Sequence, residues 1–207
     1  KTDGTLWMWG YGGTVFDGSS ISSPVQIGSD TDWANLDAGQ QTVTASKTDG
    51  KLFAWGQGDK GRADHGNTTS YSSPVQVGSD TDWNADTTQY TGQASGEKQG
   101  HALKTDGTIW GWGENERGEL GAGDTTDRSS PVQFGSESNW TKLHSKYRHT
   151  LAINSSNELW ACGLNSDGCL GDGSGLNRSS PVQIGSLRTW IKARAGPQNS
   201  LAIKDPS

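Results

Sequence analysis

One string of twelve residues recurs four times in this chain, and its spacing limits the fold more than any other feature. "SSPVQIGSDTDW" and its variants occupy residues 22–33, 72–83, 129–140 and 179–190. A second marker, "KTDG", begins at Lys1, Lys47 and Lys104, and "NSSN" stands in the same phase at Asn154. Self-similarity at a period of about 50 residues is typical of architectures that repeat one supersecondary unit. The sequence therefore predicts four copies of such a unit.

The repeats divide the chain at fixed points within one domain, residues 1–207. Their boundaries are 1–46, 47–103, 104–153 and 154–203. The anchors shared by the repeats are a proline, the tryptophan nine residues after it, and a tryptophan in the "LWMWG"-like segment: Pro24, Pro74, Pro131, Pro181, Trp33, Trp83, Trp140, Trp190, Trp9, Trp55 and Trp112. Aromatic side chains at repeating strand positions are expected to form buried columns.

Each repeat contains four short segments with strand character. "TLWMWG" (5–10) and its counterparts are apolar on successive residues, which predicts a strand buried on both faces. The run "TLAI" (150–153), a turn and the next such strand together predict a hairpin. "PVQIG" predicts a third strand with its proline at the start, and the repeated tryptophan opens a fourth. Four antiparallel strands per period predict an all-β chain that forms a β-propeller of four-stranded blades.

The composition agrees with an all-β chain. Only 29% of the residues are hydrophobic, but there are 30 glycines and ten tryptophans, as expected for short strands joined by tight turns. The net charge of −6 argues against a nucleic-acid partner, which would require a basic face. No apolar stretch approaches the roughly 18 residues of a membrane span. Because the chain begins with Lys1, we expect it to be part of a longer product.

The sequence contains no constellation typical of an enzyme, a cofactor site or a metal site. The histidines share no metal-ligand spacing: His65, His101, His144 and His149. Cys162 and Cys169 are interpreted as ordinary thiols that fill repeat positions. The acidic pairs 30/32 and 80/82 are compatible with a calcium loop, but turn and capping chemistry explains them with fewer assumptions. We predict a non-enzymatic protein with no cofactor, no metal and no catalytic residues.

Several stretches resemble the regulator of chromosome condensation repeat family. The stretches "ALKTDGTIWGWGENERGELGAGD" (102–124), "HTLAI" (149–153) and "ELWACGLNSDGCLGDG" (158–173) carry its motifs, and the "SSPVQ" extension resembles a bacterial and viral branch. The resemblance implies a propeller, in this family usually one with seven blades. Since this chain holds four repeats, it favours a portion of a longer seven-bladed propeller over a closed four-bladed ring.

The chain departs from the family pattern in two features, each of which is missing from several repeats. The N-x-x-G-x-L-G segment is intact only at 115–121 and 165–171. The family histidine is present as His149, and Thr42, Gln99 and Asn199 replace it in the other repeats. The resemblance implies that His149 supports its blade by hydrogen bonding.

Function in a propeller is expected on the loops that do not repeat. The irregular stretches are 11–21, 57–71 and 84–100, and the candidate binding residues in them are Tyr11, Phe16, Asp59, Arg62, His65, Tyr71, Tyr90 and Lys98. We predict a non-catalytic binding or structural module on a cell or virion surface, within a larger assembly, whose partner is a protein or a surface glycan. The alternatives are guanine-nucleotide exchange on a small GTPase, which the resemblance implies, and a glycan-binding surface protein.

Overall fold

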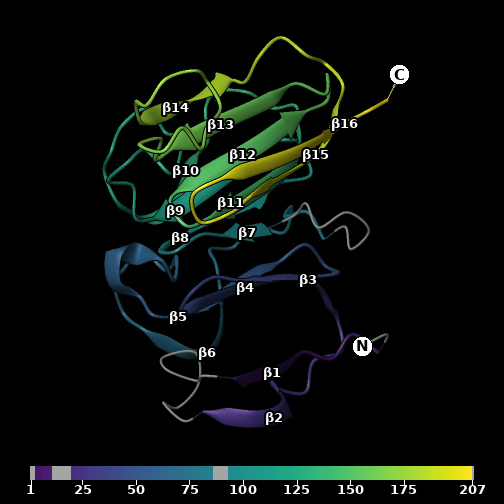
Figure 1. Ribbon diagram of the computed structural model, residues 1–207. Coiled ribbons are helices and arrows are strands. Elements are labelled where there is room, and N and C mark those ends of the chain that lie inside the picture. Colours follow the sequence, from purple (N-terminus) through teal and green to yellow (C-terminus); the bar gives the residue numbers. More distant parts are fainter. Residues whose placement is uncertain (1–2, 11–19, 86–92, 207) are drawn as a thin grey trace.

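The computed structural model describes residues 3–10, 20–85 and 93–206, and these residues form 16 β-strands and one short 3-10 turn (Figure 1). Three four-stranded antiparallel sheets follow one another, with a two-stranded sheet at each end of the series. The all-β prediction and the four-stranded antiparallel sheets are confirmed.

The three complete sheets share one order of strands. The first contains β3 (Trp33–Ala38), β4 (Thr42–Lys47), β5 (Leu52–Gly56) and β6 (Tyr71–Gln76); the turn η1 (Asp59–Gly61) follows β5. The second contains β7 (Gln93–Ser95), β8 (Gln99–Leu103), β9 (Ile109–Gly113) and β10 (Arg128–Gln133). The third contains β11 (Trp140–Lys146), β12 (His149–Asn154), β13 (Leu159–Gly163) and β14 (Arg178–Gln183).

The two-stranded sheets correspond to the two halves of this pattern. β1 (Trp7–Gly10) pairs with β2 (Ile21–Gln26) and matches the last two strands of a complete sheet. β15 (Trp190–Ala195) pairs with β16 (Ser200–Lys204) and matches the first two. Each complete sheet therefore takes two strands from the end of one sequence repeat and two from the start of the next.

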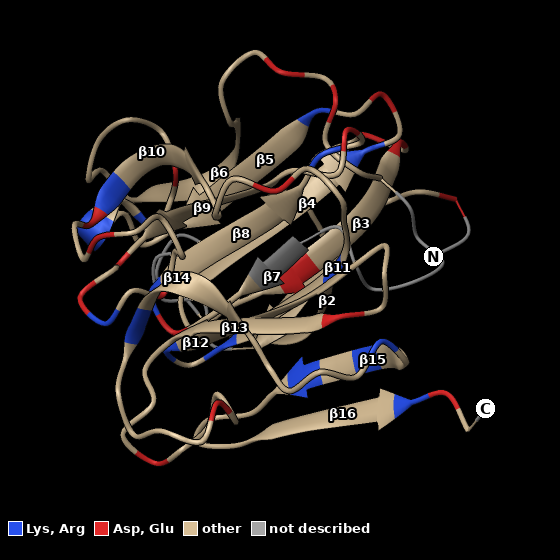
Figure 2. Cartoon of the chain, turned by 90° about the horizontal axis from the view of Figure 1, so that it is seen from above, with Lys and Arg blue, Asp and Glu red and all other residues tan. Residues whose placement is uncertain are grey.

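The sheets are arranged as blades around a common line. Successive first strands contact one another, β3 with β7, β7 with β11 and β11 with β15, so these four are the inner strands. The sheets form an arc: β1 and β2 lie at the bottom of the molecule in Figure 1, and β15 and β16 form one edge of it in Figure 2, where it is seen from above. The end strands β1 and β16 lie in separate two-stranded sheets.

A hydrophobic cluster fills each space between neighbouring blades. Between the second and third complete sheets it combines Ile109 and Phe134 with Leu143, Ala152 and Cys162. Small residues allow the sheets to approach closely. Ala54 and Ala161, for example, hold the small position of this strand and are fully buried in the clusters between their own sheet and the next. The alternation of large and small residues in the sequence therefore corresponds to nested sheets.

Two expectations from the sequence were wrong. Trp9 was expected in a strand buried on both faces, but 63% of it is exposed, whereas Trp55 and Trp112 at the equivalent positions are fully buried. The reason is that Trp55 and Trp112 pack against the sheet that precedes their own, and no sheet precedes β1 among the described residues.

The second error concerns the repeated proline. Pro24 lies inside β2 rather than at its start, where the register shifts from Ile21 opposite Gly10 to Val25 opposite Met8. Pro131 lies at the same kind of irregularity in β10. These strands form the outer edges of their sheets, so the missing N–H of proline removes no ladder hydrogen bond.

Candidate binding face at the inner turns

One face of the arc is formed by the inner hairpin turns together with the long loops that follow β5, β9 and β13. We call it the loop face: its turns are 39–41, 96–98, 147–148 and 196–199, and its loops are 57–70, 114–127 and 164–177. Backbone hydrogen bonds join the two sets, from Gln57 to Gln41 (2.9 Å), from Glu114 to Lys98 (2.9 Å) and from Leu164 to Arg148 (2.8 Å). The loops therefore start beside the turns.

A cavity of about 230 Å³ lies where the four inner turns converge. Its lining is Gly39, Gln40, Gly96, Glu97, Lys146, Tyr147 and Pro197. Four different blades supply these residues, so the shape of the cavity depends on how the blades are spaced. The lining combines an aromatic ring, a proline ring, an amide and both signs of charge, a mixture that suits a protein partner more than a purely apolar ligand.

Side chains at the family-histidine position hold neighbouring turns together. Gln99 donates from Nε2 to the carbonyl oxygen of Tyr147 (2.8 Å), and Glu97 N–H donates to the same oxygen (2.8 Å). One blade further, Nε2 of His149 hydrogen-bonds the hydroxyl of Ser200 at 3.0 Å. Burial lowers the pKa of His149 to about 4, so the ring is neutral at pH 7. These contacts fix the turns that line the cavity.

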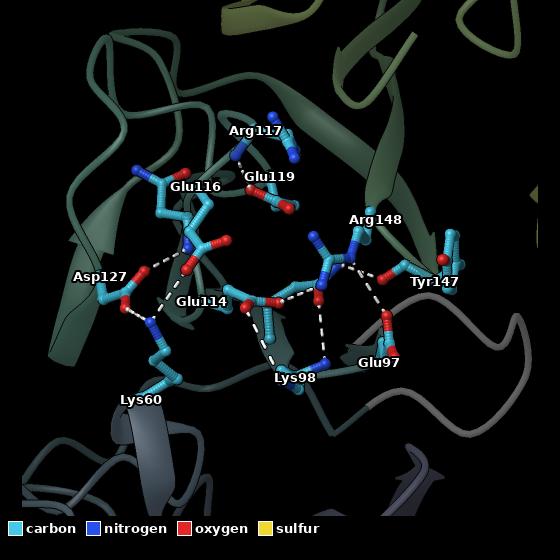
Figure 3. A network of polar contacts seen from close by, with 12 residues as sticks. Lys60, Glu97, Lys98, Glu114, Glu116, Arg117, Glu119, Asp127, Tyr147 and Arg148 are labelled. Carbon is cyan, nitrogen blue, oxygen red and sulfur yellow. Dashed lines mark hydrogen bonds and ion pairs between the residues drawn. The ribbon is translucent and has the colours of Figure 1, made fainter. Parts of the chain in front are cut away.

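A network of charged side chains extends from the cavity to the outer loops (Figure 3). Arg148 pairs with Glu97 at 3.2 Å and with Glu114 at 3.3 Å. Lys60, from the loop of the preceding blade, lies 3.0 Å from both Glu116 and Asp127. The network therefore links the turns and loops of three successive blades.

Two glutamates of the network are buried under it. The negative charge of Glu114 is compensated by ion pairs with Arg148 and with Lys98, the latter at 3.8 Å. Glu119 accepts a hydrogen bond from the backbone N–H of Arg117 (2.7 Å), but its other oxygen has no partner among the described residues. Burial raises the pKa of Glu119 to about 7, and the nearby Glu114 adds to this shift. Glu119 therefore changes its charge near neutral pH.

The structure places the candidate loop residues as follows. Tyr11, Phe16 and Tyr90 lie outside the described residues. Asp59, Arg62, His65 and Tyr71 lie together at the first long loop: Arg62 pairs with Asp59, and the rings of His65 and Tyr71 meet edge to face at 4.7 Å. Lys98 belongs to the charged network. Apart from Lys98, these residues mainly hold their own loop in shape.

The sequence reasoning missed the centre of the network: Glu97, Glu114, Glu116 and Arg148. A signal was present, because the loop "GENERGELG" (113–121) carries three glutamates, and the same positions in the next repeat are Leu164, Ser166 and Cys169. A charged residue that is present in only one copy of the repeat is not part of the shared scaffold, so it indicates a role that is specific to that copy.

The acidic pairs and the cysteines also have partners. Asp30 and Asp32 form ion pairs with Lys47 at 2.7 and 2.9 Å. Both cysteines are free and buried. Within the described ranges no three His, Cys, Asp or Glu residues are grouped closely enough to hold a metal ion. No helix in the part of the chain that the structure describes is long and apolar enough to cross a membrane.

Comparison with known families identifies the repeat. A family model of the regulator of chromosome condensation (RCC1) repeat matches residues 49–84, 106–153 and 156–203, which together make up more than half of the chain. A second model of the same repeat matches residues 140–169.

Curated relatives match over part of their length. The Ultraviolet-B receptor UVR8 of Arabidopsis thaliana is 28% identical over 159 residues, which cover 73% of this chain and 35% of UVR8. Human RCC2 is 32% identical over 88 residues, which cover 42% of this chain and 16% of RCC2. The chain thus spans a minor part of either relative.

Solved structures share the fold at low sequence identity. Yeast RCC1 (Prp20), solved with Kap60, has a TM-score of 0.83 at 17% identity, over 97% of this chain and 50% of that chain. Human WBSCR16 has a TM-score of 0.79 at 20% identity, over 98% of this chain and 54% of that chain. The described arc therefore corresponds to about half of these solved chains.

Proposed function

Since this chain belongs to the regulator of chromosome condensation (RCC1) repeat family, we propose that it is a non-catalytic binding module that docks a partner protein on its loop face. The observation that carries the proposal is the convergence of four inner turns from four blades on one cavity, with Tyr147 and Pro197 in its wall. Tyrosine and arginine are enriched among residues that dominate binding energy, and Tyr147 stands next to Arg148.

The charged network supports the same face. Glu97 lines the cavity, and the pairs of Lys60 with Glu116 and Asp127 are partly exposed on the long loops of the same face. Exposed charges at an interface govern orientation and association rate more than affinity. The relatives also support a binding role: one solved structure holds yeast RCC1 (Prp20) bound to Kap60, and Prp20p of Saccharomyces cerevisiae is described with its binding properties to Gsp1p and histones. Those partners are properties of the yeast protein, and the partner of this chain is a separate question.

Site-specific photocrosslinking tests the proposal. A photoreactive amino acid replaces the exposed Gln40 at the cavity, and in a matched control it replaces the exposed Thr48 in the turn between β4 and β5. In cells of the source organism we expect one protein to crosslink to position 40 and not to position 48. Crosslinking that is equal at both positions, or absent at position 40, would refute docking at this face.

Substitution of Tyr147 sharpens the test. Tyr147 has a φ of 53°, in the left-handed region that asparagine tolerates better than most residues. Tyr147→Asn therefore removes the ring with little backbone strain and is expected to abolish the crosslink from position 40. Faster guanine-nucleotide release from a GTPase captured in this way would establish the exchange-factor alternative. A positive glycan array with no protein crosslink would establish the glycan-binding alternative.

A further inference from the structure

Lys47 lies in a site built from two aromatic rings and two carboxylates. Its Nζ is 5.1 Å from the ring centre of Trp33 and 5.3 Å from that of Phe53. The same atom lies 2.7 Å from Asp30 and 2.9 Å from Asp32. Only 12% of the Lys47 side chain is exposed, so the ammonium is held by ring faces on one side and carboxylates on the other.

The site recurs one blade further along the chain. The Nζ of Lys104 lies 4.9 Å from the ring centre of Trp83 and 5.4 Å from that of Trp110. It is 2.6 Å from Asp80 and 3.1 Å from Asp82. Two copies with the same geometry show that this combination of residue positions binds a primary ammonium group.

In the third copy the rings and one carboxylate remain, but the lysine is absent. Trp140 and Trp160 meet edge to face with ring centres 6.0 Å apart. Glu137 occupies the position of the first aspartate, and Asn139 that of the second. Asn154 stands where the lysine was, and its Nδ2 donates to Glu158 at 2.7 Å, so its side chain is committed to its own turn.

A cavity of about 310 Å³ opens at this third copy. Trp140, Trp160 and Glu137 all line it, together with Ser136, Ser180 and Pro181. These first three are the counterparts of the residues that contact the lysine ammonium in the other two copies. The cavity is separate from the one at the inner turns, because the two share no lining residue.

We propose that this cavity binds the ammonium group of a lysine side chain from a partner protein. The chain's own lysines establish the chemistry: the ring faces attract the positive charge, and a carboxylate accepts a hydrogen bond from the primary ammonium. Glu137 is exposed at the cavity and can play the part of Asp30 and Asp80. The net charge of −6 also favours the approach of a basic partner. The proposal is independent of docking on the loop face.

The probe for the test is Nα-acetyl-lysine N-methylamide, titrated into the 15N-labelled chain. We expect saturable shifts of the indole N–H signals of Trp140 and Trp160, with a dissociation constant in the millimolar range, on the order of that for a single cation–π contact with one ion pair. The indole signals of Trp33 and Trp83 serve as internal controls and should stay in place, because their sites already hold a lysine.

Variants separate the parts of the site. Glu137→Gln keeps the shape of the side chain but removes its charge, and should weaken binding of the probe by about tenfold. The affinity of Trp160→Phe for the probe should stay within about threefold of the parent's, since the ring of Phe53 contacts the ammonium of Lys47 at the equivalent position. Asn154→Lys should place an ammonium group against Trp140 and Trp160, as Lys47 and Lys104 do at the equivalent rings, and should abolish binding by competition for these rings. Asn154→Gln is its matched control, because it also removes Asn154 but adds no charge, and should still bind.

The outcomes decide the proposal. The absence of saturable shifts at Trp140 and Trp160 would overturn it, and so would unchanged binding in both Glu137→Gln and Asn154→Lys. The Nε-trimethyl form of the probe cannot donate a hydrogen bond to Glu137. Tighter binding of that form, insensitive to Glu137→Gln, would also contradict recognition of a primary ammonium. Near-ultraviolet circular dichroism of each variant confirms that the blades remain packed.

Discussion

The Nδ1 atom of His144 on β11 accepts a hydrogen bond of 3.0 Å from the backbone N–H of Ala195 on β15. Asp37 on β3 forms the equivalent tie, since it accepts a hydrogen bond from the N–H of Ser95 on β7 at 2.5 Å. His144 and Asp37 each stand four residues after a repeated tryptophan. A side chain at this position therefore joins one inner strand to the next, and its protonation state affects the contact between blades.

His144→Asn should reduce the loss of stability in acid. Burial, with smaller contributions from Arg194 and Lys146, lowers the pKa of His144 to about 4 from the usual 6.5. Protonation therefore favours the unfolded chain, and the stability that His144 contributes is complete above pH 6.5 and is lost as the pH falls toward 4. Asparagine keeps an acceptor for Ala195 but does not titrate.

Urea unfolding at pH 7.5 and pH 5 measures this effect. The parent should lose about 1–2 kcal/mol more unfolding free energy than His144→Asn between the two pH values. The buried carboxyl groups titrate in both proteins and cancel in the comparison. An equal pH dependence in the two proteins would contradict the prediction.

Asp37→Asn should stabilise the chain at pH 7.5. Burial raises the pKa of Asp37, so the folded chain disfavours its charged form. A raised pKa means that stability is lost as the pH rises, and the advantage of Asp37→Asn should therefore shrink when the pH is lowered to 4.5. Asp37→Ala is the control, because it leaves Ser95 N–H without its acceptor and should cost about 1–3 kcal/mol. Unfolding free energies of the three proteins at both pH values provide the test.

Leu151→Ala and Leu201→Ala should differ sharply in cost. The two leucines hold equivalent positions in β12 and β16, but Leu151 is 1% exposed between two sheets and Leu201 is 72% exposed. We expect Leu151→Ala to destabilise by about 2–4 kcal/mol and Leu201→Ala by no more than about 0.5 kcal/mol. Thermal and urea unfolding of the pair measure the difference. Similar losses of unfolding free energy in the two variants would contradict the prediction and would mean that another surface buries β16 in solution.

Asn165→Ala should loosen the third long loop. The buried Asn165 side chain donates to Asp172 (2.9 Å), to the carbonyl of Ser174 (3.0 Å) and to that of Leu176 (3.2 Å), and it accepts from Leu170 N–H (3.0 Å). Losing these bonds should cost about 2–4 kcal/mol. Limited proteolysis within 164–177 should become faster, whereas Ser166→Ala at an exposed neighbouring position should cleave at the parental rate.

The strands and their buried columns could be predicted from the sequence because both follow from local patterns. Leu52, Ile109 and Leu159 share one column, and all three are buried. The division into blades was harder, because each boundary between sheets falls inside a repeat, for example between β10 and β11, and no pattern inside a repeat marks that boundary. The exposure of Trp9 depends on the same information, since it is set by the neighbouring sheet and not by the strand itself.

The candidate site was predicted only in outline. Placing function on the loops selected Lys98, which lies on the proposed loop face, whereas the loop residues His65 and Tyr71 pack on each other. The contact of Lys60 with Asp127 joins residues from different blades. Such contacts depend on how far one blade turns relative to the next, and this rotation has no signature in the sequence.

The offset between repeat and sheet has a consequence for how such a chain can grow. A duplicated sequence repeat inserts two outer strands followed by two inner strands, and each half finds its complement in the neighbour on that side. The boundaries of the sequence repeat thus fall in the middle of a sheet, so the segment that is duplicated differs from the blade that folds as one unit. Lengthening the array by one repeat adds one whole blade and leaves no unpaired strand at the junction, so the number of blades can change in evolution without an intermediate that contains a broken sheet.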